Sequence, residues 1–278
     1  NKKIVAISAG MCLGTGLARF REEIPDRFFD VGITEQHAVT MAAALAIEGY
    51  IPVCAIYSTF LQRAYDQLIH DVALQKLPVV FCVDRAGLVG EDGPTHHGPF
   101  DISYASTVPD LIVSAPKDGT ELVALLKTAV AYRRGPFFIR YPRGACGTID
   151  REDPPALRIG EWDTVREGKN PVIIAVGSMV RETLAAADLL KSRRLDPLVI
   201  NGRFVKPLDE AKLDQIAERT PLLFTVEENS VAGGFGSGVS NYFIRRGLKV
   251  KVYRIGLPDQ FIEHGPRERL LKITGLDG

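Results

Sequence analysis

Short apolar runs alternate with helix-like segments along most of this chain, and this alternation limits the folds available to it. In the first half, strand-like runs fall at residues 4–7, 27–31, 51–57, 78–83, 111–113 and 137–139. Helical patterns lie between several of them, at residues 35–48, 59–75 and 119–133. Strands with few polar interruptions that alternate with helices indicate a parallel sheet covered on both faces.

The alternation lapses between residues 144 and 170, where residues 150–155 form a charged, proline-containing connector. It then restarts, with strands expected at 172–176, 198–200, 222–226 and 250–255, and helices at 180–191, 208–219 and 238–246. The sequence therefore predicts an α/β protein of two domains, each a mostly parallel sheet flanked by helices. The expected units are a first domain at 1–148, a linker at 149–170 and a second domain at 171–278.

Composition argues against two classes of partner. The 34 Lys and Arg residues balance 34 Asp and Glu residues, and the absence of a basic excess or stripe argues against nucleic acid. No apolar run has the length of a membrane span, and no signal peptide is visible. The four cysteines lack CxxC spacing, and Cys54 and Cys82 lie in apolar strands, which predicts reduced thiols and a cytoplasmic protein.

Unusual polar and aromatic residues follow four of the predicted strands, each at or just after the point where the strand ends. They are Glu35; Tyr57, Phe60 and Arg63; Asp84, Arg85, Asp92, His96 and His97; and Arg140 and Arg143. If the strands are parallel, all four groups gather at one edge of the sheet, where α/β proteins bind ligands.

Glu35 is placed at the start of a helix, after Thr34 as a candidate N-cap. One interpretation is a carboxylate that complements the helix dipole, and the other is a ligand-binding group. Phe60 and Arg63 are three residues apart and share a helix face, which suits a ligand with a flat ring and an anionic group. The alternative is a core phenylalanine beside an arginine paired with an acid.

Residues 85–98 form a long loop with four glycines and two adjacent histidines, and long loops in compact domains are often functional. Adjacent histidines point in different directions, and no further His or Cys cluster completes a metal site. A role in proton transfer or hydrogen bonding is therefore predicted for His96 and His97. Arg143 follows a proline in a constrained turn, and with Arg63 it is a candidate phosphate clamp, the alternative being two surface arginines.

A glycine-rich segment at residues 233–238 precedes a helix and looks like a dinucleotide fingerprint. The strand before it ends in Glu227 and Glu228, which would repel a pyrophosphate. Close packing of the helix on the sheet is therefore the preferred interpretation.

Several of these segments together resemble the 1-deoxy-D-xylulose-5-phosphate synthase family. They are residues 30–37, 57–67, 84–87, 92–96, 140–144, 203–209 and 226–229. The resemblance covers essentially the whole chain. It implies a transketolase-like pyrimidine-binding domain followed by a transketolase C-terminal-like domain.

The resemblance implies a thiamine-diphosphate-dependent transferase. Members of this family join pyruvate to D-glyceraldehyde 3-phosphate with loss of carbon dioxide, for isoprenoid, thiamine and pyridoxal synthesis. Glu35 would then hydrogen-bond N1′ of the aminopyrimidine, with Phe60 stacked on its ring and Ile33 beside the cofactor. The implied substrate-binding residues are Tyr57, Arg63, Asp92, His96 and Arg143, with His96 and Asp92 also orienting the acceptor and moving protons.

One departure from the family pattern concerns the N-terminal part. Full-length members carry a domain with a Gly-Asp-Gly motif that holds magnesium and the diphosphate, and no such motif occurs here. The chain begins at Asn1 and enters a strand at once, so it is expected to be the later part of a homodimeric enzyme and inactive alone. The alternatives are a non-catalytic dimeric module and a β-type subunit of a transketolase or keto-acid dehydrogenase.

Overall fold

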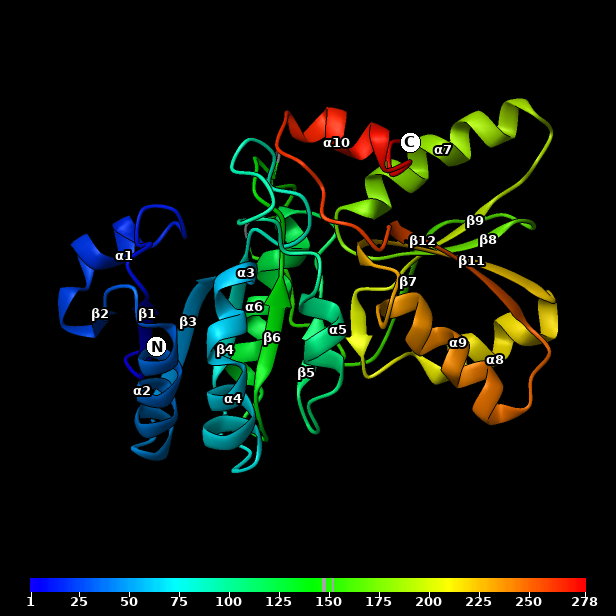
Figure 1. Cartoon of the computed structure of the whole chain (residues 1–278). Helices are drawn as coiled ribbons and strands as arrows, with labels where there is room; N and C mark the ends of the chain where they lie inside the picture. The colour runs from blue at the N-terminus through cyan, green and yellow to red at the C-terminus, as the bar shows by residue number, and fades with distance from the viewer. Residues whose placement is uncertain (147–148, 152) are drawn as a thin grey trace.

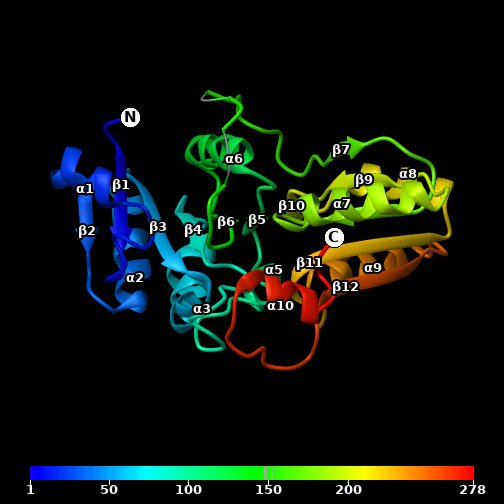
Figure 2. The same cartoon turned by 90° about the horizontal axis from the view of Figure 1, so that it is seen from above.

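The computed structural model describes residues 1–146, 149–151 and 153–278. The predicted end of the first domain at residue 148 and residue 152 of the predicted linker lie outside the described residues. Two sheets lie side by side, each with helices on both faces (Figures 1 and 2). The predicted α/β class with two mostly parallel sheets is confirmed.

The first sheet has seven strands within the described ranges. Their order is β10 (Phe204–Lys206), β5 (Ile112–Ser114), β6 (Phe137–Arg140), β4 (Val80–Asp84), β3 (Ile51–Tyr57), β1 (Ile4–Ser8) and β2 (Phe28–Asp30). All neighbours are parallel except β10, which runs antiparallel to β5. Tyr57 pairs with Asp84, so the carboxyl ends of β3 and β4 align at one edge, as the sequence predicted.

The helices of the first domain are α1 (Ala18–Glu23), α2 (Glu35–Ile47), α5 (Asp101–Ser106) and α6 (Gly119–Ala131). The helix predicted over residues 59–75 is not one regular α-helix. It consists of α3 (Ser58–Leu61), a 3₁₀ turn (Gln62–Ala64), α4 (Tyr65–Gln67) and a π-helical turn (Leu68–Ala73). Changes of hydrogen-bond spacing inside a helix are frequent at functional sites, and Arg63 lies in the 3₁₀ turn.

The second sheet has five strands in the part of the chain that the structure describes. Their order is β12 (Lys251–Leu257), β11 (Leu222–Ser230), β8 (Val172–Ala175), β9 (Leu198–Asn201) and β7 (Asp163–Arg166), with β7 alone antiparallel. The helices α7 (Met179–Ser192), α8 (Glu210–Arg219), α9 (Phe235–Arg246) and α10 (Arg267–Ile273) accompany it. β7 lies within the predicted linker, and α10 was not predicted.

β10 connects the two domains, because it follows β9 in the chain yet pairs with β5 of the first sheet. Phe204 is opposite Ser114, and the Phe204 ring lies 6.5 Å from that of Phe137. The carbonyl of Phe204 also accepts a hydrogen bond of 2.8 Å from Nε1 of Trp162. Buried side chains of both domains therefore form one continuous core cluster.

The glycine-rich turn before α9 packs tightly on the second sheet. The carboxylate of Glu227 accepts hydrogen bonds from the backbone N–H groups of Phe235 (2.7 Å) and Gly236 (2.9 Å). A Cβ at Gly236 would lie 2.4 Å from Oγ1 of Thr225, so only glycine fits this approach. The helix start is thus already occupied by a carboxylate, and the predicted close packing is confirmed.

Glu227 is expected to make the stability of the chain depend on pH. Burial raises the pKa of this carboxyl from 4.5 to about 7, against the smaller opposing effect of its two backbone hydrogen bonds. The folded chain therefore retains a proton that the unfolded chain releases, so this stabilisation is complete below pH 4.5 and is lost as pH rises through 7. The change is on the order of 3 kcal/mol.

Denaturant unfolding of the wild type and of Glu227→Gln, at intervals from pH 4 to pH 8, measures this contribution. The glutamine variant should gain stability relative to the wild type as pH rises through the window. Two parallel pH curves would contradict the assignment.

Two further features concern the predicted environment of the chain. Cys54 and Cys82 are buried, and burial raises the pKa of both thiols, that of Cys82 to about 12. The described residues include no helix that is both long enough and apolar enough to cross a bilayer.

Candidate functional site

Glu35 lies at the sheet edge where β2 gives way to α2. Asp30 shapes the turn, because its Oδ1 accepts hydrogen bonds from the N–H groups of Gly10 (2.8 Å) and Gly32 (3.0 Å). Thr34 precedes the helix, but its hydroxyl donates to the carbonyl of Val31 (2.7 Å) instead of capping the helix.

The Glu35 side chain is buried, with 1% exposed, and within residues 1–146, 149–151 and 153–278 its Oε1 has no hydrogen-bond partner. Nη1 of the mostly exposed Arg63 lies 3.6 Å from that oxygen, too far for a hydrogen bond. A buried, unsatisfied carboxylate oxygen is costly to a folded protein and points to a missing donor.

Aromatic and cationic side chains surround this carboxylate. The rings of Tyr57 and Phe60 stack at 5.4 Å, and His96 meets Phe60 edge-on at 5.3 Å. The guanidinium carbon of Arg63 lies 5.3 Å from the Phe60 centroid, so Arg63 lies close to both the ring and the acid. The structure brings together Glu35, Phe60, Arg63 and His96, which the sequence had placed after three different strands.

The long loop, which we call the site loop (residues 85–98), is closed at its base by two backbone hydrogen bonds of 2.8 Å between Gly87 and Gly98. At its tip, Oδ2 of Asp92 accepts from Nη1 of Arg143 at 2.8 Å, with both side chains partly exposed. Nδ1 of His96 lies 2.9 Å from the hydroxyl of Thr95. The site loop therefore contributes the carboxylate of Asp92 and the imidazole of His96 to the rim, and Arg143 joins them from the segment after β6.

The two adjacent histidines have different environments, as the sequence predicted. His97 is buried, and its Nδ1 accepts from the N–H of Val89 (3.0 Å), while its Nε2 lies 3.4 Å from the carbonyl of Glu263. Burial lowers the pKa of His97. This ring is therefore a neutral structural link, and His96 is the histidine beside the aromatic group.

Arg85 was noted after its strand but was not placed in the predicted site. Its guanidinium carbon lies 3.7 Å from the ring centroid of Tyr57, and its Nη1 donates to the carbonyl of Gly14 (3.1 Å). Its φ of 57°, in the left-handed region, was the feature that a sequence does not reveal. Burial raises the pKa of Tyr57. The positive charges of Arg85 and Arg143 oppose this shift, whereas the negative charges of Asp84 and Asp92 add to it.

Arg140 ends β6 at the predicted sheet edge, but its side chain does not join Glu35 and Phe60 there. It is 2% exposed and donates from Nε and Nη2 to the two oxygens of Asp101, both at 3.1 Å. Its Nη2 also donates to the backbone carbonyl of Glu228 (3.0 Å). Because it ends β6 and points inward, it joins the domains and does not face a ligand.

Two other predicted features concern Ile33 and metal binding. Ile33 is 71% exposed, so its place beside a cofactor stays a prediction. Across residues 1–146, 149–151 and 153–278, no group of three or more His, Cys, Asp or Glu side chains could hold a metal ion.

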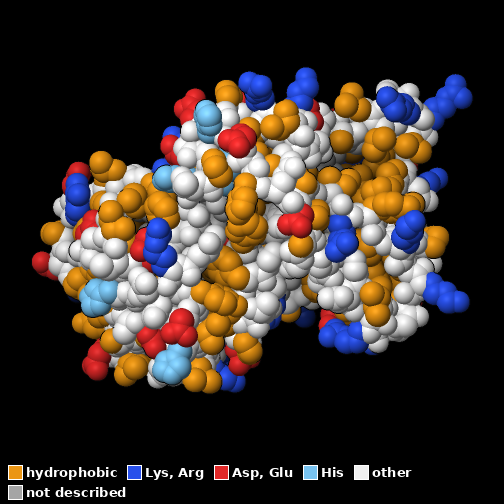
Figure 3. Space-filling model, viewed as in Figure 1, with side chains coloured by type: hydrophobic (Ala, Val, Ile, Leu, Met, Phe, Trp, Pro, Cys, Tyr) orange, Lys and Arg blue, Asp and Glu red, His pale blue; other side chains and the backbone are white. Residues whose placement is uncertain are grey.

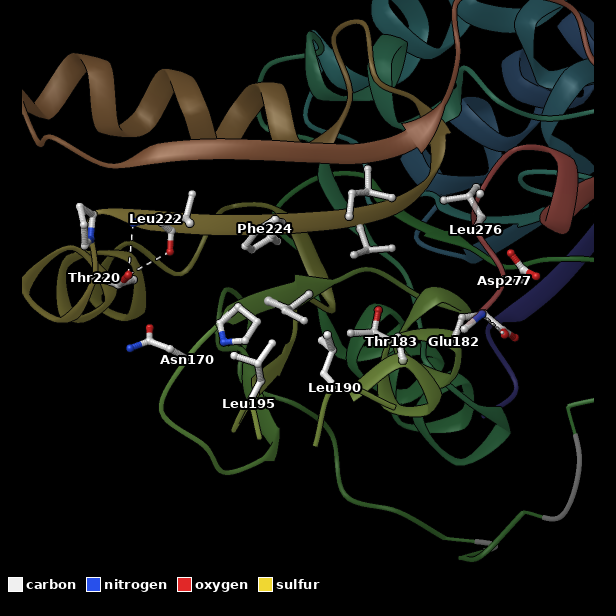
Figure 4. Close-up of a pocket in the computed structure, with 18 residues that line it drawn as sticks. Asn170, Glu182, Thr183, Leu190, Leu195, Thr220, Leu222, Phe224, Leu276 and Asp277 are labelled. Carbon is white, nitrogen blue, oxygen red and sulfur yellow. Dashed lines mark hydrogen bonds between the residues drawn. The ribbon is translucent and has the colours of Figure 1, made fainter. Parts of the chain in front are cut away.

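A large hollow of about 670 Å³ lies elsewhere, in the second domain. Figure 4 shows Leu222 and Phe224 of β11 facing Leu190 of α7 across it, and Figure 3 shows hydrophobic side chains gathered around it. No member of the predicted site lines this hollow. Its apolar walls do not suit a charged cofactor or a phosphate.

Two family models match the two domains. Residues 1–148 match the pyrimidine binding domain of transketolase, and residues 160–278 match the C-terminal domain of transketolase. With the parallel sheet and the buried acid at its edge, these matches define a class of chain: a pyrimidine-binding domain followed by a transketolase C-terminal domain.

The chain belongs to the transketolase family, since the first match alone covers 148 of its 278 residues. It is 54% identical to 1-deoxy-D-xylulose-5-phosphate synthase of Aquifex aeolicus and 54% identical to that of Desulforudis audaxviator. These matches cover 100% and 99% of this chain and 44% of each relative. The predicted resemblance to this synthase is confirmed, and the chain spans less than half the length of the relatives.

A solved structure, "Split gene transketolase, inactive beta4 tetramer", is similar in fold. It superimposes with a TM-score of 0.88 at 30% identity, over 100% of this chain and 88% of that chain. The predicted transketolase-like fold is thereby confirmed along the whole chain.

Proposed function

We propose that this chain is the C-terminal part of a 1-deoxy-D-xylulose-5-phosphate synthase. This transferase, a carboligase of the transketolase type, decarboxylates pyruvate and joins the two-carbon unit to D-glyceraldehyde 3-phosphate. The observation that carries the proposal is the buried Oε1 of Glu35, which has no donor among the residues that the structure describes and lies close to Arg63, itself beside an aromatic ring. Such an oxygen suits a protonated ring nitrogen of a planar cofactor, whose N–H would donate to it.

The residues around Glu35 fit thiamine diphosphate. When bound, this cofactor supplies an electron sink for the decarboxylation of a 2-keto acid. Glu35 would hold a proton at the aminopyrimidine N1′, where a buried carboxylate accepts a strong hydrogen bond. Phe60 offers a flat face for the pyrimidine ring, and Ile33 is proposed as an apolar contact to the cofactor.

The rim of the site suits a phosphorylated aldehyde. Arg143 already binds one carboxylate, that of Asp92, and an Arg fork binds phosphate in a similar way. Arg63 is the second cation assigned to the phosphate. His96 and Asp92 are assigned to orienting the acceptor and moving its protons, with Tyr57 beside the substrate.

The proposed partners of this chain are a metal ion, a diphosphate-binding domain and a second copy of the chain. Mg²⁺ and the diphosphate would be held by a domain with a Gly-Asp-Gly motif, and no such motif occurs in residues 1–278. The chain alone is therefore expected to be inactive. We propose a homodimer, acting in the cytoplasm, where the buried thiols of Cys54 and Cys82 stay reduced.

A second arrangement is favoured by one observation, the similarity to a split-gene transketolase chain over 88% of that chain. In that case this chain would be a β-type subunit that meets a separate diphosphate-binding chain. A Gly-Asp-Gly domain upstream in the same reading frame supports the single-chain form, and its absence supports the split form.

The proposed function is tested by assaying the chain together with its diphosphate-binding part. With thiamine diphosphate, Mg²⁺, pyruvate and D-glyceraldehyde 3-phosphate, we expect one carbon dioxide for each 1-deoxy-D-xylulose 5-phosphate formed. Release of carbon dioxide without the sugar phosphate would contradict the carboligase assignment.

Arg143→Ala should raise the KM for glyceraldehyde 3-phosphate by about tenfold or more, because it removes a charged hydrogen-bond donor from the phosphate. The KM for pyruvate should stay within about twofold. Arg246→Ala, which removes an exposed guanidinium from a surface ion pair with Asp214, is the control. An equal effect of Arg143→Ala on both substrates would exclude the phosphate-binding role.

A further inference from the structure

Glu228 is a fully buried carboxylate of the second domain whose partners include the site loop of the first. It lies on β11 with 0% exposure. Its Oε1 accepts from the backbone N–H of Leu88 (2.9 Å), and its Oε2 accepts from Oγ of Ser178 (2.8 Å) and Nη2 of Arg267 (2.6 Å). Both oxygens are satisfied, as a buried charge requires.

Arg267 completes the contact with the same loop residue. Its Nε donates to the carbonyl of Leu88 (3.1 Å), while its Nη2 is bound to Glu228. The ion pair therefore satisfies both the N–H and the C=O of one peptide residue, as a neighbouring strand would. We call these two side chains the Leu88 clamp.

The loop is seated deeply at this point. The Leu88 side chain is 0% exposed and packs in an apolar cluster with Met179, Val226 and Leu257 of the second domain. Gly87 has a φ of 77°, and a Cβ there would lie 2.5 Å from the carboxyl carbon of Glu228. Any side chain at that position would push the loop away from the clamp.

The residues after Leu88 lead directly to the rim of the site. The N–H of Val89 is bound by His97, and its carbonyl accepts from Nη1 of Arg143 at 3.5 Å. Arg143 also binds Asp92, and His96 lies against Phe60. Fixing Leu88 therefore fixes the part of the loop that presents Asp92 and His96.

We propose that Glu228 and Arg267 are positioning residues that hold the site loop in its substrate-facing conformation from the second domain. The proposal rests on the proposed function for the identity of the substrate, but the clamp itself is testable without activity. It gives the second domain, which contributes none of the predicted site residues, a direct role at the site.

Amide hydrogen exchange tests the clamp in the chain as it is. Glu228→Gln and Arg267→Gln should each speed exchange of residues 85–98 by about tenfold or more, because each breaks a charge-assisted hydrogen bond. Glu227→Gln is the matched control, since this neighbour is equally buried but binds the start of α9. It should speed exchange at α9 and leave residues 85–98 unchanged.

Unchanged exchange of residues 85–98 in both clamp variants would overturn the clamp, and so would an equal increase in Glu227→Gln. Because Arg267 lies partly at the surface, its variant keeps the test valid even if Glu228→Gln does not fold.

The assay of the enzyme assembled with its diphosphate-binding part then tests positioning. Arg267→Gln should raise the KM for the phosphorylated aldehyde by about tenfold, with the KM for pyruvate within about twofold. An unchanged aldehyde KM despite faster loop exchange would overturn the positioning role. If the wild type makes no sugar phosphate, the proposed function fails, while hydrogen exchange still decides whether the clamp exists.

Discussion

Glu35→Gln should lower the carboligation rate by about a hundredfold or more while leaving the fold intact. The rate falls because a neutral glutamine amide cannot stabilise a protonated ring nitrogen as a negatively charged carboxylate does. Stability should change little, because the Oε1 of Glu35 has no hydrogen-bond partner to lose in the described part of the chain and Arg63 lies 3.6 Å away. Initial rates and denaturant unfolding of the assembled enzyme measure the two effects.

Glu121→Gln is the matched control for this prediction. Glu121 is also a buried carboxylate near the start of a helix, but it accepts hydrogen bonds from the side chains of Asn201 (2.9 Å) and Arg203 (3.2 Å). Its variant should lose stability and keep its rate per folded molecule. A Glu35→Gln variant that forms product at the normal rate would remove Glu35 from the mechanism.

Asp101→Ala should destabilise the chain by about 3–5 kcal/mol, since it leaves the guanidinium of Arg140 buried without its carboxylate. The pair is 0% and 2% exposed and has two hydrogen bonds of 3.1 Å, so water cannot replace the lost partner. Denaturant unfolding measures the change.

The exposed ion pair between Glu210 and Arg245 provides the contrast, with both side chains mostly in solvent. Glu210→Ala should alter stability by less than about 1 kcal/mol. Similar losses for the buried and the exposed pair would show that burial does not set the cost.

The main strands and most helices could be predicted because their apolar patterns are local. β10 and β7 could not be predicted, because each is short and is defined by antiparallel pairing with a strand that is distant in the sequence. The break in the predicted helix at residues 59–75 was equally hidden, because α-helical, 3₁₀ and π-helical turns have similar side-chain patterns.

The candidate site likewise has parts that the sequence predicts and parts that it does not. The shared sheet edge of Glu35, Phe60, Arg63 and His96 was predictable, because parallel strands end together. The inward turn of Arg140 was not, because its partners are Asp101 and a carbonyl of the second domain. Whether Arg140 or Arg143 turns inward depends on contacts that only the folded chain reveals.

The strand β10 bears on how this protein can be divided. A fragment ending near residue 150 would lack this strand and leave β5 as a bare sheet edge, which favours pairing with other chains. Such a fragment should therefore tend to self-associate. The intact chain should unfold in one cooperative transition, because the core around Phe137 includes Phe204 from the later half.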